Sequence, residues 1–204
     1  MTKKHLFIII VWIVSCIFSV QAQSFKGGFH LGLLASQVDG DERGGYHKPG
    51  LFAGAFVYLP LKEDILNLQF EINYAQKGAK SQRKRKDETL DKFRILLQQI
   101  EMPVLLNYCV TNQLSVGGGP SFNLLVHKKI YSPSGELVPI EKGDFRFFEL
   151  GILLGANYSF KEHFGASFRF GYSLTPIGSD FYVRRRILKG LRNNFLQFHL
   201  SYQF

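Results

Sequence analysis

The sequence of this 204-residue chain predicts an all-β fold, an eight-stranded antiparallel up-and-down β-barrel that spans a membrane. Three observations support this fold class. Large apolar side chains recur at every second position of eight segments, which is the period of a strand with one apolar face. The connections between the segments alternate between short and long, as in membrane barrels. No stretch after residue 22 has the roughly 20 consecutive apolar residues that a membrane-spanning helix requires.

The start of the chain resembles a secretory signal peptide. A short basic stretch precedes an uncharged apolar run at 6–20, and small residues surround Gln21 as at a cleavage site. We expect 1–22 to be removed, which leaves the barrel domain 23–204. Two alternatives are an uncleaved anchor helix and a lipoprotein modified at Cys16.

The composition of the mature chain differs from that of a small secreted scaffold. Cys109 would be its only thiol, so it has no internal disulfide. Loss of Lys3 and Lys4 lowers the net charge from +9 to +7, which is still basic. The full chain contains 20 Phe and 9 Tyr residues.

The first two predicted strands alternate weakly. The eight predicted strands are 25–38, 50–61, 65–77, 96–110, 113–127, 146–160, 164–176 and 193–204. The second face of the first strand holds small residues such as Gly28 and Gly32. Ala53 and Ala55 are the small face of the second strand, so we expect its aromatic residues, Phe52 among them, to point outward.

The other six strands alternate more clearly. In 65–77 apolar even positions oppose polar odd positions such as Glu71, and 96–110 has the same phase. Glycine and serine fill most of the second face of 113–127, whereas Leu153 interrupts that of 146–160. The last two strands place Phe, Leu and Tyr on even positions and mainly Gly, Ser, Arg169 and His199 on odd ones.

The connections set the orientation of the barrel. Short turns are expected at 60–64, 111–112 and 161–163, and long loops at 39–49, 78–92, 128–144 and 178–192. Short turns face the periplasm in this class and long loops face the exterior. Both chain ends are then periplasmic, and the last strand must pair with the first because a sheet in lipid has to close.

The bulky face is predicted to contact lipid. The interior of an eight-stranded barrel is barely wide enough for side chains, so large residues would overfill it. Aromatic residues also gather near the strand ends, as in the interfacial girdles of membrane barrels. The expected girdle residues are Tyr58, Tyr108, Tyr158, Phe160, Phe164, Tyr202 and Phe204 on the periplasmic side, and Phe52, Tyr74, Phe147 and Phe148 on the outer side.

Five stretches resemble the PorT-like outer-membrane β-barrel family of Gram-negative bacteria. They are IEMPVLLNY at 100–108, GGGPSFNLLV at 117–126, GANYSF at 155–160, FGYSLTPI at 170–177 and the terminal YQF. The resemblance implies an outer-membrane location. It also implies that the terminal aromatic residues, Tyr202 and Phe204, belong to the signal that the barrel-assembly machinery reads. Most members have no assigned activity, and the namesake is linked to a protein-secretion machine.

Charged and titratable residues on the small face are expected inside the lumen. They are Lys26, His30, Glu71, Glu101, Glu149, Arg169 and His199. Glu71 and Arg169 lie at similar depth on the third and seventh strands, so we expect them to pair, since an unpaired buried charge is costly. A gate is one interpretation of this pair. We favour a structural plug, because a barrel of this size leaves no aqueous channel.

Two predicted loops are strongly basic. Their candidate binding residues are Lys80, Arg83, Lys84, Arg85, Lys86, Arg184, Arg185, Arg186, Lys189 and Arg192. Such residues favour an anionic partner, namely lipopolysaccharide phosphates, an acidic polysaccharide or an acidic protein. The alternative is that the loops only lie near anionic lipid head groups. Nucleic acid is not expected, because no aromatic residues interleave the basic runs.

These observations predict a non-enzymatic outer-membrane barrel, in contact with lipid, that acts through its surface loops. We expect no catalytic residue, cofactor or metal. One alternative is an accessory subunit of a secretion or surface-motility assembly. Another is a barrel hydrolase or acyltransferase that uses His47 or His127 at the outer rim, although no spacing links them to serine and acid partners. A soluble lipocalin-like carrier would need the apolar face inward.

Overall fold

The computed structural model describes residues 25–39, 45–62, 65–80, 94–131, 136–137, 145–178, 181–183, 186–188 and 190–204. The expected signal peptide, 1–22, lies outside these residues.

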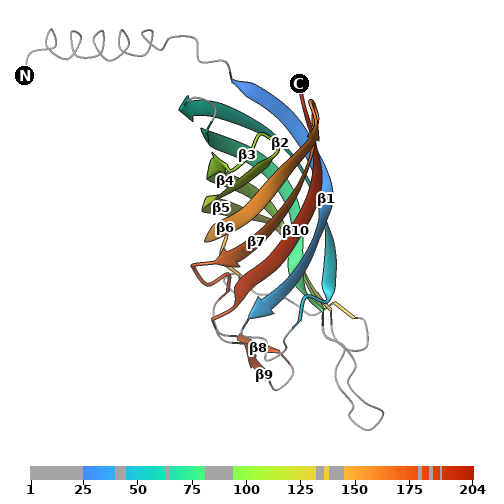
Figure 1. Ribbon diagram of the computed structural model, residues 1–204. Helices are drawn as coiled ribbons and strands as arrows, with labels where there is room; N and C mark the ends of the chain where they lie inside the picture. Colours follow the sequence, from blue (N-terminus) through green and yellow to red (C-terminus); the bar gives the residue numbers. More distant parts are fainter. Residues whose placement is uncertain are drawn as a thin grey trace, which may run out of the picture.

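Eight antiparallel strands close into a barrel (Figure 1). They are β1 (Lys26–Asp39), β2 (Lys48–Lys62), β3 (Leu66–Lys80), β4 (Arg94–Cys109), β5 (Leu114–Tyr131), β6 (Phe148–Lys161), β7 (Phe164–Ser173) and β10 (Arg192–Gln203). Their order around the barrel is β1-β10-β7-β6-β5-β4-β3-β2. Each corresponds to one predicted strand, so the predicted fold class is confirmed.

The last strand closes the barrel against the first. β10 pairs with β1 without interruption from Gly28↔Gln203 to Asp39↔Arg192. This pairing provides hydrogen-bond partners for the backbone groups on the facing edges of β1 and β10, for which lipid offers none. β1 begins and β10 ends at the same end of the barrel (Figure 1).

Several strands extend past the predicted limits on the long-loop side. β3 continues to Lys80, β4 already begins at Arg94, and β5 runs to Tyr131. Lys80 pairs with Arg94, which pairs in turn with Tyr131, so the hydrogen-bonded ladder continues where the apolar alternation has ended. The last loop also contains a short hairpin that was not predicted, β8 (Phe181–Val183) with β9 (Arg186–Leu188).

The bulky face points outward and the charged face points inward. Phe168 and Phe198 are each 54% exposed, whereas Glu71 and Arg169 are 6% and 3% exposed. The exposed apolar side chains occur on all eight barrel strands, as lipid contact requires. Among the described residues, no helix is both long and apolar enough for a membrane crossing.

The predicted orientation of β2 is wrong. Phe52 and Phe56 are buried in the lumen, while Leu51 and Val57 are exposed. Phe52 therefore does not belong to the outer girdle, and Tyr58, on the same face, lines the interior. The reason lies on β1, where the direct partners of Phe52 and Phe56 are Gly32 and Gly28.

Glycines on the lumen face provide the volume that large side chains occupy. A Cβ at Gly28 would lie 2.6 Å from the ring of Phe56, and one at Gly171 would lie 2.2 Å from the ring of Phe195. Gly155, the partner of Arg169, would meet its Cγ at 2.6 Å. Small and large residues therefore face each other across strand pairs, which fills the narrow lumen at these levels.

We expect Gly171→Ala to destabilise the barrel by about 1–3 kcal/mol, because the added methyl group overlaps the Phe195 ring in a packed interior. The free energy of unfolding in urea, measured in lipid vesicles, tests this. Combination with Phe195→Leu should recover part of the loss. Ala156→Val on the outer face is the matched control, and an equal loss from the control would contradict the packing argument.

Candidate functional site

The lumen contains a buried ion pair between opposite walls. Glu71 on β3 receives two bonds from Arg169 on β7, at 2.8 and 2.9 Å. Gln69 donates to one carboxylate oxygen at 2.6 Å, and Asn73 donates to the other at 2.8 Å. Each oxygen of Glu71 thus accepts two hydrogen bonds, which is close to the capacity of a carboxylate. The expected pair is present, in a layer without net charge.

A second ion pair lies nearer the long loops. Lys77 on β3 pairs with Glu101 on β4, and its Nζ lies 4.0 Å from the centroid of the Phe195 ring. Gln197 donates to Glu101 at 2.9 Å from the opposite wall. Lys77 was not among the candidate lumen residues. It lies at an odd position of β3, as Glu71 does, and this parity could have placed it in the lumen.

Glu149 is held by neutral donors. Gln99 and Asn193 donate to its Oε2 at 2.6 and 2.8 Å, and the Ser173 hydroxyl donates to Oε1. Within the described part of the chain, Glu149 forms no ion pair. Two side-chain amides and one hydroxyl, from β4, β10 and β7, therefore stabilise this buried charge.

His30 and His199 form an aromatic layer with Phe52. The two imidazole centroids are 4.8 Å apart, and each lies 5.0–5.1 Å from the Phe52 ring. Nε2 of His30 is 2.6 Å from Oδ1 of Asn73, whose amide nitrogen bonds Glu71. This layer lies against the first ion pair and helps to fill the barrel.

An apolar cap closes the lumen at the long-loop end. It is built from inward residues at the strand ends and from residues of the long loops that cover them. Its members are Val38, Ala79, Ile95, Leu97, Ile130, Phe145, Ile177 and Leu191, all of them buried. Among the described residues, this cap covers the polar layers on the long-loop side.

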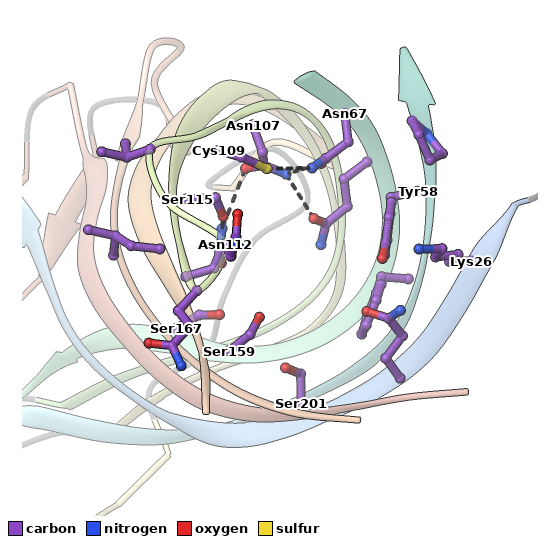
Figure 2. A pocket seen from close by; sticks show the side chains of 18 of the residues that line it. Lys26, Tyr58, Asn67, Asn107, Cys109, Asn112, Ser115, Ser159, Ser167 and Ser201 are labelled. Atoms are coloured by element: carbon purple, nitrogen blue, oxygen red, sulfur yellow. Dashed lines mark hydrogen bonds between the residues drawn. The ribbon is translucent and has the colours of Figure 1, made fainter. Parts of the chain in front are cut away.

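The opposite end of the lumen is hollow. A cavity of about 520 Å³, the inner cavity, extends from the short turns to Arg169, His30 and His199. Figure 2 shows its labelled side chains around an open centre, with Asn67 and Asn107 on one wall and Lys26 and Tyr58 on another. Lys26, one of the expected lumen charges, is exposed at this rim, apart from the buried layers.

The basic loop candidates fall mostly outside the described residues. Those outside are Arg83, Lys84, Arg85, Lys86, Arg184, Arg185 and Lys189. Lys80 is exposed at the end of β3, and Arg186 belongs to β9. Arg192 is half-buried and donates to the carbonyls of Ser173 and Leu174 at 3.2 and 2.5 Å, so it covers the end of β7.

The terminal aromatic residues lie on the outer face of the periplasmic end. Tyr202 contacts the ring of Phe164 with centroids 5.2 Å apart, and Phe204 lies 5.8 Å from Phe29. Their role in barrel assembly stays a prediction. The rim histidines of the enzymatic alternative, His47 and His127, are both exposed. The serine and acid residues that such an enzyme would use there, Ser132, Ser134, Asp144 and Asp180, lie outside the described residues.

A closed barrel with an apolar outer face and a narrow polar lumen is typical of small outer-membrane barrel proteins. The chain matches the family described as outer membrane protein beta-barrel domain over residues 21–179. It therefore belongs to this family, and its location is the outer membrane. A search of curated protein sequences found no match.

Ail and Neisserial surface protein A are among the solved structures that share this fold. Ail, the attachment invasion locus protein of Yersinia pestis, is 12% identical, with coverage of 88% of this chain and 98% of that chain and a TM-score of 0.53. Neisserial surface protein A is 11% identical, with coverage of 87% and 97% and a TM-score of 0.56. Ail also has a structure in complex with the heparin analogue sucrose octasulfate. At these identities the similarity concerns the fold alone.

We expect Arg169→Met to destabilise the folded barrel by about 3–5 kcal/mol, because it leaves Glu71 buried without its cation. The double variant with Glu71→Gln should recover most of this loss. Urea unfolding in lipid vesicles measures both. Lys161→Met at the exposed periplasmic rim removes the same charge and serves as the control. A double variant as unstable as the single one would contradict the ion-pair argument.

Proposed function

We propose that this protein is a non-enzymatic, non-conducting outer-membrane barrel that binds an anionic partner at the cell surface through its basic loops. The observation that carries the proposal is the closed lumen. Two ion-pair layers, the Glu149 network and the apolar cap fill the barrel from Arg169 to the long loops. A lumen filled in this way would not transport solutes, and the loops would then make the contact with the exterior.

Charge supports an anionic partner. Five basic residues lie within 80–86, and five more lie within 184–192. Arginine and lysine at such density attract phosphate, sulfate and carboxylate groups. The complex of Ail with a heparin analogue shows that a barrel with this fold is compatible with polyanion binding. Lipopolysaccharide, an acidic polysaccharide and an acidic protein are the proposed partner classes.

We also propose that the chain belongs to the PorT-like branch of outer-membrane barrels. The support is the order and spacing of the five stretches between 100 and 204. Assembly would then depend on the barrel-assembly machinery and on Tyr202 and Phe204. No observation on the described residues favours a role in a secretion or motility assembly over surface binding.

Charge reversal of Lys84, Arg85 and Lys86 to glutamate should abolish retention of the detergent-solubilised protein on a heparin column at physiological salt. The unmodified protein should be retained and should elute as salt rises, because such attraction is screened. The control reverses Lys26, Lys62 and Lys161 at the periplasmic end, which changes the net charge equally. Equal loss of retention in both variants would show that net charge alone causes binding.

We expect no steady single-channel conductance from the protein in planar bilayers. A variant with Leu97→Ala and Ile130→Ala, which thins the apolar cap, should also stay closed, because the charged layers beneath remain intact. Stepwise currents from the unmodified barrel would contradict the closed lumen and would revive the gate interpretation of Glu71 and Arg169.

A further inference from the structure

We propose that the inner cavity is a binding site for a small hydroxyl-rich anion, such as a sugar acid or a sugar phosphate, that enters from the periplasm. The cavity volume of about 520 Å³ falls within the range of roughly 300–1,000 Å³ typical of ligand sites. The site lies at the end of the barrel opposite the basic loops, so the inference does not rest on the proposed surface function.

The charges that reach the cavity are positive. The charged side chains among its lining residues are Lys26 and Arg169, and no aspartate or glutamate of the described part of the chain lines it. Glu71 lies behind the floor, where its oxygens already accept four hydrogen bonds. Arg169 uses one N–H of each terminal nitrogen for Glu71 and has five such donors in all. A carboxylate or phosphate at the floor would meet its remaining donors and no competing carboxylate.

Two buried histidine nitrogens at the floor lack a protein partner. His30 and His199 are 4% and 1% exposed, and Nδ1 of each forms no hydrogen bond within the described chain. Because Nε2 of His30 donates to Asn73, a neutral His30 ring has Nδ1 as an acceptor. A buried polar atom without a partner is unfavourable. A ligand hydroxyl at the floor would supply the missing donor.

One wall of the cavity is a preorganised amide array. Asn107 donates to Asn67 at 3.1 Å and to Gln69 at 2.9 Å, and Asn157 donates to Ser115 at 3.4 Å. Gly117 faces Asn107 across the strand pair, and a Cβ there would lie 2.2 Å from its Oδ1. Amides and hydroxyls both donate and accept, which suits adjacent hydroxyl groups of a sugar.

Three ligands separate the parts of this proposal in calorimetric titrations of the detergent-solubilised barrel. Glucuronate carries a negative charge and sugar hydroxyl groups, glucose carries the hydroxyl groups alone, and inorganic phosphate carries the charge without a sugar. We expect saturable binding of glucuronate, at least about tenfold tighter than that of either other compound, because charge-assisted bonds and hydroxyl contacts act together. Glucose 6-phosphate should bind like glucuronate if the anionic group can be a phosphate.

Variants then locate the site. Lys26→Met should weaken glucuronate binding about threefold with little effect on glucose, because this exposed charge attracts the anion from the rim without contacting it. Ser167→Leu at the cavity wall should weaken the binding of both. Lys129→Met removes an equal charge at the long-loop end of β5 and should change neither. The gel mobility of unheated samples confirms that each variant is folded. Absence of saturable glucuronate binding, equal binding of phosphate, or indifference to both cavity variants would overturn the proposal.

Discussion

The narrowness of the closed barrel is the constraint on which the rest of this structure depends. Eight strands leave an interior only as wide as its side chains, so each large inward residue needs space on the neighbouring strand. Glycine supplies that space opposite Phe56, Phe195 and Arg169. Each of these glycines therefore packs against one large side chain of the neighbouring strand. The positions of the glycines determine where large side chains fit in the lumen.

The same narrowness determines how charge is accommodated. Water has little access to the middle of the lumen, so each carboxylate there needs dedicated partners. Glu71 and Glu101 have cations, whereas Glu149 relies on amide and hydroxyl donors. The resulting layers are rigid and specific. They are better suited to stabilising one barrel geometry than to opening a path through it.

The two ends of the barrel differ in chemistry. The long-loop end is covered by apolar side chains, including Ile95 and Leu97, whereas the short-turn end is hollow and polar, with Lys26 and Arg169 in its lining. A molecule in the periplasm and one outside the cell therefore meet unrelated surfaces of the same protein. Surface binding and the inner cavity can be separated experimentally for this reason.

The sequence alone predicted the eight barrel strands, the lipid-facing side of most of them and the pairing of Glu71 with Arg169. These features follow from the two-residue period and from the position of a residue along its strand, which can both be read within one segment of the sequence. Lipid requires every strand to be hydrogen-bonded on both edges, so the same reasoning applies to all of them. Tertiary structure alone decided the inward turn of Phe52 and Phe56, the partner of Lys77 and the hollow inner end. Each of these depends on which residues of different strands meet across the barrel, and that register is a property of the closed sheet as a whole.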